Sequence, residues 1–234
     1  MSYRYIKAPP GYTLRRRPRA LNFRLLFSSL LLTLGVTAFT SVAYPMLVYQ
    51  LTFAPRFSTA AAANSNDTTT VLPEMVNTAL DYTNSDAWFS PATHPNNSSQ
   101  ISYTLSIPRL NIYSAVVRND HTDLKESLIH YPGTAFPGDL GNGVIFGHSV
   151  LPQFFNPKNY LTIFSTLHLL EPGDEIEIVF GPATYTYQIK DIYETTPDDL
   201  SPLAQSYNNR VLTLITCTPP GTYLRRLIVK AVLL

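Results

Sequence analysis

The chain has 234 residues, of which 45% are hydrophobic, and its formal net charge at pH 7 is +1. This length gives room for one domain with appendages, and this hydrophobic fraction is enough for a folded core. The small net charge gives no reason to expect a nucleic-acid partner, and we predict none.

Charge divides the N-terminal part of the chain. Residues 1–24 are basic, whereas no charged residue occurs between Leu25 and Pro55. The apolar stretch Leu25–Tyr49 exceeds the roughly 20 residues that a helix needs to cross a hydrocarbon core. By the positive-inside rule, we predict a cytoplasmic segment at 1–24, a transmembrane helix at 25–53 and an extracytoplasmic remainder. The protein would then be a single-pass protein of the cell membrane, in contact with membrane lipid.

A cleaved signal peptide is the alternative interpretation, because Ser41-Val42-Ala43 resembles a cleavage site. The apolar core of a signal peptide is only about 7–15 residues long. Here apolar residues continue past that site as far as Tyr49. We therefore favour an uncleaved anchor.

Residues 54–100 are rich in Ala, Asn, Ser, Thr and Pro, a composition typical of a linker with little buried surface. Within this extracytoplasmic linker, Leu72–Phe89 is more apolar and contains Trp88, the only tryptophan of the chain. We expect this stretch to form a short helix or a lid that docks on the following domain.

From Ile101 to Leu234 the pattern changes to short segments with a period of two, such as ISYTLSI, separated by turns rich in Pro and Gly. Many short strands with such turns predict an all-β domain, a barrel or a sandwich, at residues 101–234. We expect little helix, the main candidate being Asn159–Leu170, which ends before Pro172-Gly173.

Cys217 is the only cysteine, and it stands at the end of the predicted strand VLTLIT, just before Pro219-Pro220-Gly221. It has no partner for an internal disulfide. A lone cysteine often packs as a small hydrophobe. Its position at a strand end, however, is typical of functional residues.

A thiol needs a nearby base or cation to become a nucleophile. Of the five histidines, His148 ends the segment GVIFGH and would present its ring at a strand terminus, like Cys217. His130 also precedes a turn and is the second candidate. Arg225 and Arg226 open the next strand, and strand alternation allows only one of them to face the thiol. The remaining histidines are expected to be solvated or packed: His94, His121 and His168.

These segments resemble the sortase family. TLITC (Thr213–Cys217) matches its TLxTC signature, IFGHS is similar to its histidine segment, and RLIVKA is similar to the strand opened by its essential arginine. The resemblance covers residues 101–234. It implies a closed eight-stranded β-barrel with short helices, in which Cys217 is the nucleophile, His148 the acid and base, and Arg226 the arginine. Arg225 would then point away from the thiol.

The resemblance also implies a cysteine transpeptidase. Such an enzyme cleaves an LPxTG-like sorting motif of a secreted surface protein and holds the acyl group as a thioester. It then passes this group to an amine of peptidoglycan or of a pilin. We expect Thr213, Thr216 and Ser149 to contact substrate, and no cofactor or metal to be needed. Asp198-Asp199 alone does not make a calcium site.

Asp86-Ala87-Trp88 is similar to the Asp-Pro-aromatic lid motif of pilus-assembling sortases, although the proline is absent. Asp86 and Trp88 are therefore candidate lid residues. The subclass stays open between E-like, D-like and C-like.

There are three alternatives to a transpeptidase. A papain-like protease is disfavoured, because there the cysteine precedes its histidine. A non-catalytic membrane-tethered β-domain would need no thiol at a strand end. A cysteine endopeptidase that only hydrolyses would use the same residues.

Overall fold

The structure, a computed structural model, describes Arg4 and residues 23–57, 83–88 and 101–234. The chain divides into two compact units, Met1–Ser41 and Val42–Leu234.

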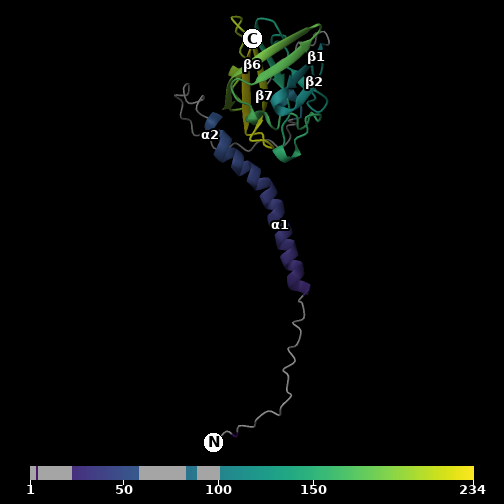
Figure 1. The fold of residues 1–234 in the computed structure, drawn as a ribbon, viewed down its shortest axis with the longest axis vertical. Coiled ribbons are helices and arrows are strands. Elements are labelled where there is room, and N and C mark those ends of the chain that lie inside the picture. Colours follow the sequence, from purple (N-terminus) through teal and green to yellow (C-terminus); the bar gives the residue numbers. More distant parts are fainter. Residues whose placement is uncertain (1–3, 5–22, 58–82, 89–100) are drawn as a thin grey trace. The chain divides into compact units, whose positions relative to one another are not determined.

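The N-terminal helical segment consists of α1 (Phe23–Val48), the π-helical turn η1 (Tyr49–Phe53) and α2 (Ala54–Phe57) (Figure 1). It is long and apolar enough to cross a membrane, and α1 buries none of its residues. This confirms the predicted apolar N-terminal helix. The helical path runs on to Phe57, past the predicted end at residue 53.

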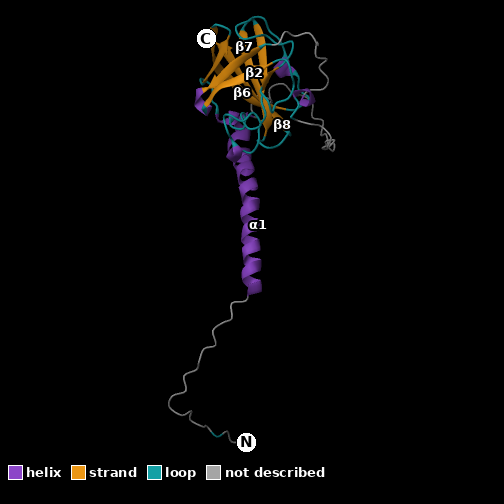
Figure 2. Ribbon diagram, turned by 90° about the vertical axis from the view of Figure 1, so that its right-hand side faces the viewer, coloured by secondary structure: helices purple, strands orange, loops and turns teal. Residues whose placement is uncertain are grey.

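The C-terminal domain is a closed barrel (Figure 2). Its strand order is β1-β2-β3-β4-β7-β8-β6-β5. Its strands are β1 (Ser102–Ile107), β2 (Ile112–Arg118), β3 (Leu128–His130), β4 (Gly141–Phe146), β5 (Glu175–Phe180), β6 (Ala183–Thr195), β7 (Arg210–Thr218) and β8 (Arg225–Leu233). Short 3-10 helices accompany them: η3 (Ser85–Trp88), η4 (Pro108–Leu110), η5 (Pro152–Phe154), η6 (Leu167–Leu169) and η7 (Ser201–Leu203). The predicted fold class is confirmed.

Two neighbouring pairs of strands, β2–β3 and β4–β7, are parallel, and the other pairs are antiparallel. Because β4 and β7 run in the same direction, their carboxyl ends meet at one edge of the barrel. β8 returns from that edge as the antiparallel partner of β7. The three strands thus bring the ends of β4 and β7 and the start of β8 together.

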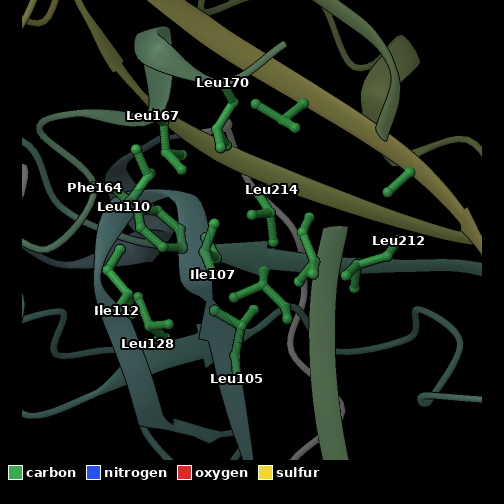
Figure 3. Packing of buried hydrophobic residues seen from close by; sticks show 14 of the residues in the cluster. Leu105, Ile107, Leu110, Ile112, Leu128, Phe164, Leu167, Leu170, Leu212 and Leu214 are labelled. Carbon is green, nitrogen blue, oxygen red and sulfur yellow. The ribbon is translucent and has the colours of Figure 1, made fainter. Parts of the chain in front are cut away.

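Alternate residues of the strands fill the barrel interior. Leu105 and Ile107 of β1 and Leu212 and Leu214 of β7 belong to one buried cluster (Figure 3). All eight strands contribute residues to this cluster. Burying a side chain of this kind contributes about 1.5–3 kcal/mol. The interior therefore accounts for the strict period of two in these strands.

A second buried cluster, here called the outer cluster, lies on the opposite side of the barrel wall. Its β7 members, Ile215 and Cys217, alternate with the interior residues of that strand. The members of the outer cluster are Trp88, Leu124, Ile129, Tyr131, Val144, Phe146, Ile215, Cys217 and Ile228. Apolar side chains outside a barrel need a cover, and Trp88 is part of that cover.

The helix predicted at Asn159–Leu170 was wrong, because this segment forms turns and contains only the short η6. The Thr162 hydroxyl lies within hydrogen-bond distance of the carbonyl oxygens of Asn156 and Asn159, and the Asn159 side chain accepts from the amide of Leu161. Such local bonds compete with helical ones. The apolar spacing that suggested a helix instead places residues such as Phe164 in the interior.

The segment just after the predicted span packs on the barrel. Tyr49 is 3% exposed and Phe57 is 5% exposed, and Phe57 belongs to the interior cluster. The prediction assigned residues 54–100 to a linker with little buried surface, whereas the structure buries Phe57. The short helix expected within Leu72–Phe89 is described only over residues 83–88, where η3 forms. The rest of that stretch lies outside the described residues.

Candidate active site

Cys217 and Arg226 are direct cross-strand partners. Cys217 lies near the end of β7 and Arg226 is the second residue of β8, and the two are paired in the antiparallel register. Directly opposed residues of an antiparallel pair project from the same face of the sheet. The register expected for the last hairpin is therefore confirmed. Both side chains are almost fully buried, at 0% and 1% exposed.

His148 follows β4 at the same edge. The parallel register of β4 and β7 pairs Phe146 with Ile215, so continuing it by two residues brings His148 level with Cys217. Gly147 supports this continuation, since its amide donates to the carbonyl of Ile215 at 3.2 Å. The structure thus brings together the three residues that the sequence predicted as catalytic.

Two hydroxyl groups lock this arrangement. Thr216 Oγ1 donates to the carbonyl of Gly147 at 2.8 Å, and Ser149 Oγ donates to the carbonyl of Cys217 at 2.7 Å. Thr216, the neighbour of Cys217, thus bonds the residue before His148. Ser149, the neighbour of His148, bonds Cys217 itself. Thr216 and Ser149 therefore hold His148 and Cys217 in register.

Thr213 lies farther along β7, where its hydroxyl donates to Asn142 Oδ1 of β4 at 2.7 Å. Asn142 in turn donates to the carbonyl of Pro202 at 2.8 Å. Like Thr216 and Ser149, Thr213 has an internal partner and is buried. Substrate contact by these three residues stays a prediction.

Burial dominates the electrostatics of the thiol. It raises the pKa of Cys217 to about 11, and the positive charge of Arg226 opposes this shift. A thiol with this pKa is protonated at neutral pH and is a poor nucleophile. Burial thus disfavours the thiolate of Cys217, and the neighbouring Arg226 charge favours it.

Trp88 supplies much of this cover. It is 1% exposed, shares the outer cluster with Cys217, and lies against Phe146 with ring centroids 5.5 Å apart. The Cζ atom of Arg226 lies 5.2 Å from the centroid of the Trp88 ring, a cation–π distance. Asp86 lies in the same turn, η3. The lid role of Asp86 and Trp88 stays a prediction, and the position of Trp88 supports it.

The lid segment is tied to the barrel by backbone bonds. Asn84 forms an isolated β-bridge with Asp123, the amide of Ser85 donates to the carbonyl of Thr122, and the amide of Leu124 donates to the carbonyl of Thr83. These contacts involve only the loop after β2, not the strands that carry the three predicted catalytic residues. The Trp88 side chain, by contrast, contacts Phe146 of β4 and Arg226 of β8.

One N–H group of Arg226, that of Nε, donates to no acceptor among the described residues. Nη1 of the same side chain lies 3.2 Å from the carbonyl of Tyr223 and 3.3 Å from that of Arg225. A buried guanidinium with an unused N–H can donate to an oxygen of a bound substrate. Sequence reasoning missed Tyr223, whose ring is parallel to that of His148 at 6.4 Å between centroids.

His130, the second candidate base, has a different environment. On β3 it alternates with Ile129 and precedes Tyr131, which are both in the outer cluster, so it faces the other side of the wall from Cys217. Its Nδ1 lies 2.7 Å from Tyr103 Oη, and burial lowers its pKa to about 4. His130 is thus a packed histidine.

The other histidines lie away from the thiol or outside the description. His168 packs edge-on against Tyr49 and Phe53, and Nε2 of His121 lies 3.1 Å from the Ser127 hydroxyl. His94 lies outside the described residues. Within the described ranges, no group of three or more His, Cys, Asp or Glu residues is arranged to hold a metal ion.

Comparisons with known proteins agree with this geometry. A family model described as the sortase domain matches residues 105–234, more than half of the chain. The sequence is 28% identical over 142 residues to sortase D of Bacillus subtilis (strain 168), covering 60% of this chain and 64% of that protein. The chain thus spans slightly less than two thirds of the length of this curated relative.

Solved structures give the same result. Sortase C-1 of Actinomyces oris matches with a TM-score of 0.50 and 28% identity, over 56% of this chain and 72% of that one. Sortase A of Corynebacterium diphtheriae matches with a TM-score of 0.50 and 30% identity, over 59% and 62% of the two chains. These relatives carry three different class letters, so the subclass stays unresolved. The barrel, the edge that joins Cys217 to Arg226 and the matched family model together establish that this chain belongs to the sortase family of transpeptidases.

Proposed function

We propose that this protein is a membrane-anchored sortase that cleaves an LPxTG-like sorting motif and transfers the acyl group to an amine of peptidoglycan or of a pilin. The observation that carries the proposal is the meeting of Cys217, Arg226 and the segment ending in His148 at one edge of the barrel. Family membership supports the reaction class.

In the first half-reaction, the Cys217 thiol passes its proton to His148, and Sγ attacks the carbonyl carbon of the threonine in the sorting motif. Arg226 donates hydrogen bonds to the carbonyl oxygen or to a neighbouring substrate carbonyl, where negative charge accumulates. His148 gives a proton to the leaving amine of the following residue. The C–N bond breaks, and the acyl group remains on Cys217 as a thioester.

In the second half-reaction, an incoming amine attacks the thioester carbonyl. His148 now removes a proton from this amine, and the thiol of Cys217 leaves. The new amide joins the surface protein to its acceptor. A cysteine endopeptidase would differ only here, because water would replace the amine.

The decisive experiment incubates the full-length protein with an LPxTG-like peptide panel, with and without amine acceptors, and reads the products by mass spectrometry. We expect a thioester adduct on Cys217 and an amide product when the amine is present. Cys217→Ala should form neither. Hydrolysis with every amine tested would favour the endopeptidase, and no adduct with any peptide would favour a non-catalytic β-domain.

A further inference from the structure

A buried carboxylate joins four elements next to the predicted catalytic pair. Glu194, near the end of β6, is 2% exposed. Its Oε1 accepts from the Tyr49 hydroxyl at 2.5 Å and lies 3.1 Å from Thr218 Oγ1, and its Oε2 lies 3.3 Å from Arg225 Nη1. Thr218 Oγ1 also lies 2.5 Å from Tyr49 Oη. We call these residues the Glu194 network: Tyr49, Glu194, Thr218 and Arg225.

The network lies one residue pair beyond Cys217 and Arg226. Thr218 and Arg225 are direct partners in the β7–β8 register, immediately after the pair Cys217 and Arg226. Because neighbouring side chains of a strand alternate, Thr218 and Arg225 face away from the thiol. Glu194 therefore holds the two strands together from the opposite side of the barrel wall.

The carboxylate determines how tightly these strand ends are held. An ionised carboxylate removed from water is costly unless its oxygens are fully paired. Here Arg225 supplies the charge, and Tyr49 and Thr218 supply hydroxyl donors. If one donor is lost, Glu194 must bind another partner or water. This change would displace Thr218 and Arg225, and with them the adjacent residues Cys217 and Arg226.

Tyr49 reaches the network from the helical segment that follows the predicted membrane span. It opens η1, and its ring and that of Phe53 both contact the ring of His168 edge-on. Phe57, one turn farther, joins the interior cluster. This part of the helical segment is thus folded onto the barrel, and Tyr49 is fixed at Glu194 by packing on both sides.

We propose that Tyr49 and Glu194 are positioning residues of the acyl transfer. Through Thr218 and Arg225 they fix the ends of β7 and β8 and thereby the relative placement of Cys217 and Arg226. The helical segment after the membrane span is in this way a part of the active site's support. The kinetic consequence rests on the proposed function, whereas the effect on the thiol does not.

The test compares Tyr49→Phe with Tyr44→Phe in the full-length protein. Each substitution removes one hydroxyl from the helical segment, but Tyr44 is 69% exposed. We expect Tyr49→Phe to lower kcat for thioester formation by about fivefold, the equivalent of one ordinary hydrogen bond, with KM unchanged. Tyr44→Phe should match the wild type. A purely structural role would lower the folded fraction without this split between kcat and KM.

A second readout needs no sorting substrate. The rate of Cys217 alkylation by iodoacetamide is followed from neutral to alkaline pH. The titratable groups on the side of the thiol include Arg226, His148, Tyr131, Tyr193 and Tyr223, and Tyr49, Glu194 and Arg225 lie on the other side of the wall. The Arg226 charge favours the thiolate. We expect the midpoint of this profile to move to higher pH in Tyr49→Phe, which leaves every charge in place, because Arg226 is held less well. Glu194→Gln should move it less far, because the loss of a negative charge favours the thiolate.

The double variant checks that the two residues act together. The kcat losses of Tyr49→Phe and Glu194→Gln should be clearly less than additive, since both disturb one network. Additive losses, or a Tyr49→Phe protein equal to Tyr44→Phe in both readouts, would overturn the proposal. If the wild type turns over no peptide, the proposed function fails, and the alkylation profiles still decide whether Tyr49 and Glu194 position the thiol.

Discussion

At the scale of single residues, two adjacent arginines have different tasks. Arg226 is buried beside the thiol and under Trp88, whereas Arg225 turns to the other face and pairs with Glu194. Strand alternation alone produces this division, because consecutive side chains leave a strand in opposite directions. The same rule separates Cys217 from Thr218.

Replacement of Arg226 tests its role most directly. Arg226→Ala should lower kcat/KM for transpeptidation by about 3 kcal/mol of transition-state stabilisation, comparable to the loss of one oxyanion-hole donor. Arg109→Ala is the matched control, because Arg109 is exposed on η4. Steady-state kinetics with a sorting-motif peptide provides the measurement. Equal rates in the two variants would remove Arg226 from the mechanism.

Two buried histidines predict acid sensitivity. Burial lowers the pKa values of His130 and His168 from 6.5 to about 4. The unfolded chain therefore binds more protons between these pH values, so the free energy of unfolding falls as the pH drops below about 6.5 and levels off below about 4. Each histidine contributes about 3 kcal/mol to this loss. Urea unfolding at successive pH values measures this fall in the free energy of unfolding.

A single substitution isolates one of the two. His168→Phe keeps an aromatic ring against Tyr49 and Phe53 but removes the titrating group. We expect a shallower fall of the unfolding free energy between pH 6.5 and 4 than in the wild type. An unchanged slope would show that His168 does not titrate in this range.

At the scale of elements, the edge formed by β4, β7 and β8 and its cover are held by different bonds. Hydroxyl bonds from Thr216 and Ser149 join the β4 and β7 ends, whereas η3 is held by backbone bonds to the loop after β2. A cover that opens would suit a reaction that must admit a peptide.

Removal of the Trp88 side chain should uncover the thiol. Trp88→Ala is expected to raise the rate of Cys217 modification by a small methanethiosulfonate by on the order of tenfold. In this variant, exposure of the thiol no longer requires a large buried ring to move into water. Phe154→Ala, which truncates an aromatic that is 63% exposed, is the control. If both variants react like the wild type, Trp88 does not limit access to Cys217.

The sequence was informative where structure depends on local pattern. A period of two and Pro-Gly turns predicted the strands, and strand alternation predicted that only one of Arg225 and Arg226 faces Cys217. The resemblance to the sortase family identified this residue as Arg226, and the register of β7 and β8 pairs Arg226 with Cys217. The Asn159–Leu170 segment misled because apolar residues spaced for a helix also suit turns that send side chains into a core.

Long-range partners gave no such signal. In the sequence IYET, Glu194 looks like any acidic residue at the end of a strand. The position of Tyr49 after the apolar stretch is typical of an aromatic residue at a membrane interface. Only the closed barrel and the docked helical segment bring these two side chains within 2.5 Å. Residues 145 positions apart cannot be paired from composition or periodicity.

At the scale of the whole molecule, the second compact unit begins at Val42, well before the first strand. The folded domain therefore includes the end of the predicted span as well as the barrel. Tyr49 and Phe57 are its buried N-terminal contacts.

This organisation predicts that truncation is costly. A fragment of residues 101–234 should be less stable than one of residues 42–234 by about 3 kcal/mol or more, because it lacks the buried rings of Tyr49, Phe57 and Trp88. Denaturant unfolding of the two fragments measures the difference. Equal stabilities would mean that the helical segment adds nothing to the fold.

The topology of the anchor is a separate prediction. With the basic residues 1–24 inside the cell, protease added to spheroplasts should digest the barrel and spare the N-terminus. An epitope tag at each end distinguishes the two fragments on a blot. A mature protein in the medium that begins near Tyr44 would instead indicate a cleaved signal peptide.

The cover over Cys217 also bears on the chemical survival of the enzyme. A thiolate attacks peroxides and disulfides, and its oxidation by peroxide beyond sulfenic acid to sulfinic and sulfonic acid is irreversible. A thiol whose pKa is raised to about 11 under Trp88 offers almost no thiolate to these reagents at neutral pH. We therefore expect the single thiol of the chain to resist oxidation while Trp88 covers it, and to become vulnerable when this cover opens.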